Sequence, residues 1–415
     1  MYEIYGGWAI LDQSRVSSFQ SRPTVEKDIS LVVEKDRIID IGKTTNIREK
    51  YKFSDSLGSK EWVISPGFID GHLHSSQRPT IGKVKSAKLL EWLKAIWKWE
   101  GRMTKSDAKK CAETTYRELL ASGVTSFLDY TSVRHTDEAF KVAEKIGLRA
   151  TIGKTMMDRN SIPALLEDTD QSLRETEKLL RKWHGSAKGR LRYSITPRFG
   201  ITCTDELLRG AIKLSKKYRA IITTHAHENR GEIAYDKKNY QGKSAIMHFD
   251  DIGLLGENTL LVHGVWLTTN ELEALARTKT AYIHCPGSNI MLKSGSANVN
   301  KILKAGIRLG LGSDIGAYKR VGQFDQMQLA IRVQKQNHKF LRPQTSFFLA
   351  TQGSADAMGL GKETGSLKIG KKADIVLLEP GRVGTRSLVD RIVNHCKPAN
   401  VRKVIVDGKL LLDRE

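Results

Sequence analysis

The chain has 415 residues, of which 40% are hydrophobic and 27% are charged, a balance typical of a globular enzyme and unlike that of a disordered chain. Its net charge of +22 raises the question of nucleic-acid binding. The lysines and arginines are spread along the chain, however, and no basic block is interleaved with aromatic residues. We therefore expect no specific nucleic-acid partner. No apolar run approaches the roughly 20 residues that span a bilayer, so we expect no membrane partner either.

The start of the chain and its cysteines predict the cellular compartment. The opening MYEIYGGWAILDQSR lacks the basic region, apolar stretch and small-residue cleavage site of a signal peptide. The four cysteines are Cys111, Cys203, Cys285 and Cys396, and no two of them form a CxxC pair. Isolated thiols are typical of a reducing compartment. The predicted location is the cytoplasm.

From about residue 62 to about residue 340, apolar strand-like runs alternate with amphipathic segments. The strand-like runs cover residues 62–74, 124–131, 148–157, 190–199, 220–227, 259–267, 280–288 and 307–316. Segments such as 137–146, 204–218 and 269–278 have apolar residues at the three- and four-residue spacing of a helix. Eight strands alternating with helices predict an α/β fold, a (β/α)8 TIM-like barrel, although a large open sheet would give a similar pattern.

The two ends of the chain have a different pattern. Residues 29–42, 371–380 and 401–412 form short strand-like runs separated by Gly, Asp and Lys. Neither end is long enough to make a good core alone, so we predict that both termini join in one small β-sandwich beside the barrel. The predicted domains are the catalytic barrel, 62–358, and the two parts of the sandwich, 1–61 and 359–415.

Side chains that can bind a metal cluster at the ends of the strand-like runs, where a barrel of this kind places its active site. They are His72 and His74 in the first run, His225 in the fifth, His263 in the sixth and Asp314 in the eighth. The alternation of a strand puts the first two histidines on one face. A lone histidine at a strand end is more often structural, but five such side chains at four strand ends indicate a metal site.

Nitrogen and oxygen donors without thiolate suit one divalent ion, Zn²⁺ or Fe²⁺. Such an ion lowers the pKa of water from about 15.7 to about 7, and a carboxylate must then move protons. Glu228 follows His225 by three residues, which places it beyond the strand end, over the metal. The chain has no GxSxG elbow, no GxxxxGK[ST] loop and no PCxxC pair, so a serine hydrolase, a phosphate loop and the cysteine-ligated deaminases are not supported.

Four motifs, PGFIDGHLH, HAHE, LVHGV and GLGSDIGA, together resemble the amidohydrolase superfamily. No lysine stands at the fourth strand end, where RYSITPRF carries Arg198, and this favours the one-metal branch that deaminates bases. Longer stretches resemble the guanine deaminase family, in order, from about residue 62 to residue 380: HLHSSQ, LLEWL, GKTMMDRN, SITPRFGITCT, THAHENRGEIAY, HCPGSNIMLKSG and LGSDIGA.

The resemblance implies a role for each matching residue, and it also implies a homodimer. The metal ligands would be His72, His74, His225 and Asp314. Glu228 would shuttle protons, and Asp314 would also accept a proton from the attacking water. His263 would contact or orient that water, either as a weak fifth ligand of the metal or through a hydrogen bond, and the base would be held by Gln77, Arg198 and Phe199. The chemistry agrees, because Arg198 can donate to a purine carbonyl. The amide of Gln77 can both donate and accept, and Phe199 can stack on the base.

Each of these three substrate residues also has an ordinary structural interpretation. Arg198 can pair with an acidic neighbour, Gln77 can cap a turn, and Phe199 can belong to the core. The implied reaction converts guanine and water to xanthine and ammonia. The alternatives are deamination of 8-oxoguanine, a pterin, cytosine or an s-triazine, or a basic binding protein without catalysis on the same fold.

Three segments depart from the family pattern by being basic. They are residues 78–88, Lys293, and residues 317–326, all expected in loops over the active site. Added positive charge there would suit an anionic or bulkier base, so these loops are the part of the pattern that bears on substrate choice.

Overall fold

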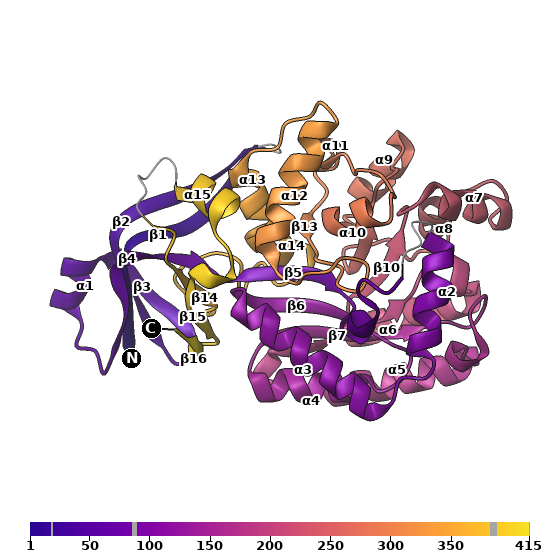
Figure 1. The fold of residues 1–415 in the computed structure, drawn as a ribbon, viewed down its shortest axis with the longest axis horizontal. Helices are drawn as coiled ribbons and strands as arrows, with labels where there is room; N and C mark the ends of the chain where they lie inside the picture. Colours follow the sequence, from indigo (N-terminus) through magenta and orange to yellow (C-terminus); the bar gives the residue numbers. More distant parts are fainter. Residues whose placement is uncertain (18–19, 85–88, 382–387, 415) are drawn as a thin grey trace.

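The computed structural model describes residues 1–17, 20–84, 89–381 and 388–414. Figure 1 shows a barrel with its helices at one end of the molecule and, at the other end, a sheet in which both chain termini lie. The predicted α/β architecture is confirmed.

Every strand-like run between residues 62 and 316 contains a strand of the barrel. The strands are β5 (Phe68–Leu73), β6 (Val124–Thr131), β7 (Arg149–Met156), β8 (Leu191–Tyr193) with β9 (Thr196–Pro197), β10 (Ile222–Ala226), β11 (Thr259–His263), β12 (Ala281–His284) and β13 (Leu309–Leu311). They form two parallel half-barrels, β5 to β9 and β10 to β13. One seam closes through the bridge between Ile195 and Ile222, and the other through the 2.9 Å bond from Asp314 N to the His72 carbonyl.

Helices surround the barrel and cover both parts of the molecule. They are α1 (Thr44–Lys50), α2 (Leu89–Glu100), α3 (Lys105–Ala121), α4 (Thr136–Ile146), α5 (Thr169–Trp183), α6 (Asp205–Tyr218), α7 (Arg230–Asn239), α8 (Ala245–Asp251), α9 (Thr269–Arg277), α10 (Pro286–Met291), α11 (Val299–Lys304), α12 (Gln323–Gln336), α13 (Pro343–Phe348), α14 (Ser354–Ala357) and α15 (Leu388–His395). The starts of α3, α6 and α9 follow from the sequence, because Thr104, Thr204 and Thr268 accept a backbone N–H at the N-cap.

The termini form one seven-stranded mixed sheet in the order β16-β15-β14-β4-β1-β2-β3. Its strands are β1 (Tyr2–Ser17), β2 (Gln20–Glu34), β3 (Arg37–Lys43), β4 (Ser56–Pro66), β14 (Ile375–Leu378), β15 (Val401–Val406) and β16 (Lys409–Asp413). Alternation sends Ile375 into a small core of the sheet's own and Val376 into the barrel core. The edge strand β3 also bridges Arg37 to Lys372. The sandwich expected from the sequence is thus one continuous sheet around its own core.

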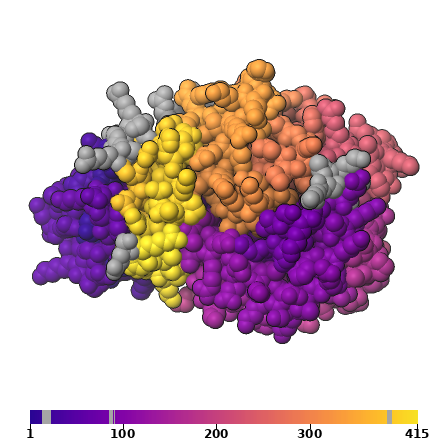
Figure 2. Space-filling model, in the orientation of Figure 1, coloured from indigo at the N-terminus to yellow at the C-terminus, as the bar shows by residue number. Residues whose placement is uncertain are grey.

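The mixed sheet packs against the amino ends of the barrel strands. Arg149, the first residue of β7, is buried and paired with Asp374, at 2.7 Å, and with Asp407 of the turn before β16. Figure 2 shows the C-terminal segment lying on the surface between the N-terminal strands and the barrel. The domain boundaries predicted near residues 61 and 359 stay predictions.

Within the described residues, no helix is long and apolar enough to cross a membrane. All four cysteines are buried and free.

Candidate active site

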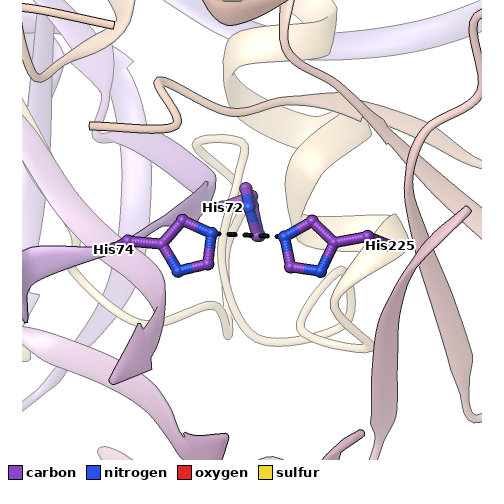
Figure 3. A group of neighbouring side chains, drawn as sticks. All are labelled: His72, His74 and His225. Carbon is purple, nitrogen blue, oxygen red and sulfur yellow. Dashed lines mark hydrogen bonds between the residues drawn. The ribbon is translucent and has the colours of Figure 1, made fainter. Parts of the chain in front are cut away.

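The predicted metal ligands meet at the carboxyl ends of β5, β10, β11 and β13. His74 Nε2 lies 3.2 Å from His225 Nε2, and Asp314 Oδ1 lies 3.5 Å from His72 Nε2 and 3.6 Å from His74 Nε2. Figure 3 shows the imidazoles of His74 and His225 facing each other, with His72 beside the line that joins them. One ligand atom from each of His72, His74 and His225 lies within 4.8 Å of the others, and the same holds for His72, His263 and Asp314.

The outer nitrogens of two of these rings are held by backbone carbonyls. His74 Nδ1 lies 3.1 Å from the Tyr130 carbonyl, and His225 Nδ1 lies 2.7 Å from the Arg198 carbonyl. These contacts orient each ring so that its Nε2 atom faces the centre of the cluster. Within the described residues, His72 Nδ1 has no hydrogen-bond partner, and His72 Nε2 has the 3.5 Å contact with Asp314 Oδ1. A buried nitrogen without a partner is expected where a metal ligand stands.

The protonation states of the cluster also suit a cation. Burial lowers the pKa of His72, His74, His225 and His263, so these rings are neutral and keep their lone pairs. Burial alone would raise the pKa of Asp314. The hydrogen bond with His72 and the neighbouring imidazoles outweigh this effect and hold the pKa well below its usual range. Three neutral imidazoles and one carboxylate make a donor set that fits Zn²⁺ or Fe²⁺.

Three residues of the site have strained backbones. His227, His263 and Asp314 have φ values of 57°, 80° and 49°, in the left-handed region that non-glycine residues seldom adopt. Such strain collects at functional sites, where the surrounding structure holds it in place.

Glu228 lies two residues beyond the end of β10, as expected, with Oε2 3.6 Å from His263 Nε2. Its other oxygen accepts a 3.4 Å bond from Ser294 Oγ. Burial, together with the charge of Asp314, raises the pKa of Glu228 to about 8. A carboxyl group whose pKa is near neutrality can both hold and release a proton, as a proton shuttle requires. The ring of His263 is oriented from behind, because its Nδ1 lies 3.1 Å from Asn289 Oδ1.

A pocket with about 390 Å³ of atom-free space opens onto this cluster. It is lined by His74, Leu89, Trp92, Leu93, Arg198, Phe199, His225, Glu228, Glu232, His263, Leu292, Asp314 and Ala317. One wall is therefore apolar and aromatic, and the polar groups gather on the metal side and at Arg198. A mainly apolar cleft with a few placed polar groups is typical of a small-molecule site.

Arg198 and Gln77 meet at the carboxylate of Glu100, the last residue of α2. Arg198 Nη1 lies 3.1 Å from Glu100 Oε2, and Gln77 Nε2 donates to Glu100 Oε1 at 3.4 Å. Ser76 Oγ donates to the same oxygen at 3.2 Å. Gln77 is completely buried behind the residues that line the pocket, and its Oε1 has no partner within the described residues. Phe199 and Arg198 both line the pocket, whereas Gln77 reaches it through Glu100.

Sequence reasoning missed three buried carboxylates around the site. Glu100 pairs with Arg198. Asp129 accepts from Ser75 N at 2.9 Å and from Tyr116 at 2.6 Å, and so supports the segment after β5. Glu232 lines the pocket. Asp129 had a visible signal, because it stands inside the strand-like run VTSFLDYT. The other two lie on helices, where an acidic residue is ordinarily exposed.

Three basic residues of the divergent loops are absent from the lining of the pocket. Lys293, Lys319 and Arg320 are exposed, and Arg320 Nη1 pairs with Asp325 at 3.1 Å. Residues 85–88, the end of the first basic segment, lie outside the described residues. The described loops therefore give no support to an anionic substrate.

Comparison with known proteins agrees with this site. The amidohydrolase family model matches residues 63–411. The guanine deaminase of Escherichia coli strain K12 is 31% identical over 385 residues, covering 88% of this chain and 87% of that protein. The 5-methylthioadenosine/S-adenosylhomocysteine deaminase of Carboxydothermus hydrogenoformans is 31% identical over 413 residues, covering 98% and 93%. A solved structure of E. coli guanine deaminase superimposes with a TM-score of 0.93 at 28% identity and covers 100% of both chains.

The chain belongs to the amidohydrolase family. It is an enzyme, a hydrolase that acts on carbon–nitrogen bonds. The site and the relatives together support deamination of a purine-like base.

Proposed function

We propose that this enzyme converts guanine and water to xanthine and ammonia. The observation that carries the proposal is the placement of Arg198. Its guanidinium lines the pocket beside the metal cluster, held by Glu100 at 3.1 Å. A planar guanidinium donates to a ring carbonyl, and guanine carries such a carbonyl whereas adenine does not.

The pocket wall supports a free base over a nucleoside. The apolar and aromatic residues of the lining pack together in one cluster: Leu89, Trp92, Leu93, Phe199, Leu292 and Ala317. A flat purine ring packs well on such a surface. The hydroxyl groups of a ribose would lose their hydrogen bonds to water there, at a cost of about 1–3 kcal/mol each.

Each polar residue would have a defined part. His72, His74, His225 and Asp314 would hold one Zn²⁺ or Fe²⁺ ion. When bound, this ion would supply hydroxide at neutral pH. Asp314 would accept the proton of the attacking water. Glu228 would give its proton to the ring nitrogen next to the reacting carbon, take up the hydroxyl proton of the tetrahedral carbon and pass it to the departing ammonia. The proton held by Asp314 would then return to Glu228 and restore the starting state.

His263 would orient the attacking water, because its Nε2 lies 3.6 Å from Glu228 Oε2 and faces the cluster. Arg198 would donate to the carbonyl, Phe199 would stack on the base, and Gln77 would act through Glu100. These assignments bring the reacting carbon, the water and the proton carrier together within one pocket.

The test is ammonia release by the metal-replete chain, ranked by kcat/KM. The substrates are guanine, 8-oxoguanine, adenine, cytosine, isoxanthopterin, an amino-s-triazine and 5-methylthioadenosine. Guanine should rank first, and a different base or the nucleoside at the top would refute the guanine assignment. Release from none of them would refute the deaminase assignment.

An arginine variant sharpens the test. Arg198→Ala should lower kcat/KM for guanine by about 10- to 100-fold, because it removes a charged hydrogen bond of about 1.5–3 kcal/mol. The matched control is Arg192→Ala on β8, whose side chain pairs with Glu363 away from the pocket. The control should retain full activity. Equal guanine turnover in both variants would exclude Arg198 as the carbonyl partner.

A further inference from the structure

The buried face of helix α7 carries two carboxyl side chains, where the buried face of a helix ordinarily carries apolar residues. The buried residues of α7 are Glu232 and Asp236, one turn apart. Burying carboxylates is costly unless they are hydrogen-bonded, so this face of α7 is not explained by packing. Glu232 is 2% exposed and lines the pocket next to Glu228.

The carboxylate of Glu232 gathers three consecutive backbone N–H groups. It accepts from the amide of His227 at 3.1 Å, of Glu228 at 2.9 Å and of Asn229 at 3.3 Å. The last of these bonds belongs to an ordinary capping box with Asn229. The first two go beyond it, into the turn that carries Glu228.

That turn is strained and is held from both sides. His227 has a left-handed φ of 57°, a conformation that is unfavourable for a non-glycine residue. Its carbonyl accepts from Val265 N at 2.9 Å, and its Nδ1 lies 3.2 Å from the Trp266 carbonyl. Successive N–H groups around a left-handed residue form a concave site for an anion. The two carboxyl oxygens of Glu232 fill that site from within the chain.

We propose that Glu232 is a positioning residue for Glu228. By holding the amides of residues 227–229, its carboxylate stabilises the strained turn and keeps the Glu228 side chain beside His263. The inference rests on the proposed function, in which Glu228 carries the protons. A displacement of about 1 Å in a reacting group lowers the rate by about 10²-fold, so the predicted effect lies in kcat.

The kinetic test uses Glu232→Gln and Glu232→Ala in the metal-replete chain, with the best wild-type substrate. The amide of Glu232→Gln retains one acceptor oxygen, whereas Glu232→Ala retains none. Glu232→Gln should lower kcat by about 10- to 100-fold and Glu232→Ala by more. KM and metal content should stay within about twofold of wild type, because a residue that acts by positioning Glu228 affects the chemical step and not the binding of substrate or metal.

The matched control is Asp107→Asn, which weakens the capping box of α3. Asp107 Oδ2 accepts from Thr104 N at 3.0 Å, far from the pocket on the helix after α2. This variant should keep the wild-type kcat. A kcat of Glu232→Ala within about twofold of wild type would overturn the proposal. So would a rise in KM or a loss of metal as large as the loss in kcat.

Amide hydrogen exchange in the unmodified chain tests the geometry without any assay of activity. The amides of residues 227–229 should exchange slowly, because Glu232 accepts from all three, and rapid exchange would overturn the proposal even if the variants failed to fold. If the chain released ammonia from no base, the proposed function would fail. The positioning by Glu232 would then be tested by amide exchange alone. If the inference is right, the amides of residues 227–229 exchange faster in a folded Glu232→Gln variant than in the wild type.

Discussion

At the amino ends of the barrel strands, the guanidinium of Arg149 is buried between Asp374 and Asp407, and Asp374 also accepts from the backbone N–H of Asp407 at 2.9 Å. At the carboxyl ends, buried polar groups lack partners among the described residues. Both ring nitrogens of His284 and Nδ1 of His72 are examples. The buried guanidinium at the amino ends is paired with two carboxylates, whereas these imidazole nitrogens at the carboxyl ends have no partner in the described part of the chain.

The difference shows which end serves stability and which serves chemistry. A buried charge pair holds the mixed sheet on the barrel, and breaking such a pair is strongly destabilising. Open polar groups cost stability, but they are available to a metal and a substrate. The active sites of TIM barrels lie at the carboxyl ends of the strands. Variants at the two ends should therefore separate activity from stability.

Removal of a metal ligand should have the largest effect on activity. His225→Ala should lose the metal and lower kcat/KM by more than about 10³-fold, because the ion supplies several kcal/mol of transition-state stabilisation. Metal analysis of the purified variant and ammonia release measure the two quantities. A fully active variant without metal would contradict the assignment of the chemistry to the carboxyl ends of the strands.

Glu228→Gln should retain the metal and lower kcat by about 10²- to 10⁴-fold, because the amide cannot carry a proton. Its thermal midpoint should not fall, since a buried carboxyl with a raised pKa is replaced by a neutral group of the same shape. Kinetics and thermal unfolding of the same sample check both points. Normal turnover would remove Glu228 from the proton path.

Arg149→Ala should have the opposite profile. It leaves Asp374 buried without its cation, so the free energy of unfolding should fall by about 3–5 kcal/mol. The kcat/KM of the folded enzyme should stay unchanged. The control is Arg320→Ala, which breaks an exposed pair with Asp325 and should cost at most about 1 kcal/mol. Denaturant unfolding measures both, and equal costs would contradict the structural role of the amino end.

Asp236→Asn should give the smallest change, and the change should depend on pH. Burial and the charge of Glu232 raise the pKa of Asp236 from 3.8 to about 8, while Arg159 opposes the shift. The folded state then favours the protonated form, so wild-type stability falls as the pH rises from about 4 to about 8.

The asparagine variant cannot ionise, so its stability relative to wild type should increase by at least about 1 kcal/mol between pH 5 and pH 8. Thermal unfolding across this range measures the difference. A constant difference would show that Asp236 ionises normally. Asp236 would then not belong with the unpaired buried groups at the carboxyl ends of the strands.

Much of the fold could be predicted because its signals are local. Strand-like runs of fully buried residues alternate with amphipathic helices, and each period follows from backbone geometry within a few residues. The clustering of the predicted metal ligands could be predicted as well, because parallel strands bring their carboxyl ends to one edge. The placement of His72, His74, His225 and Asp314 together needed only that rule.

The rest was decided by contacts between residues far apart in the chain. Glu100 reaches Arg198 across 98 positions, and no periodicity in the sequence predicts such a contact. The same holds for Gln77, which the fold buries behind the pocket wall, and for Lys293, which it turns to solvent. By itself, the sequence determined the barrel and the chemistry at its strand ends, because these depend on local backbone geometry. Only the tertiary structure decided which side chains orient that chemistry, because orientation depends on packing between distant segments.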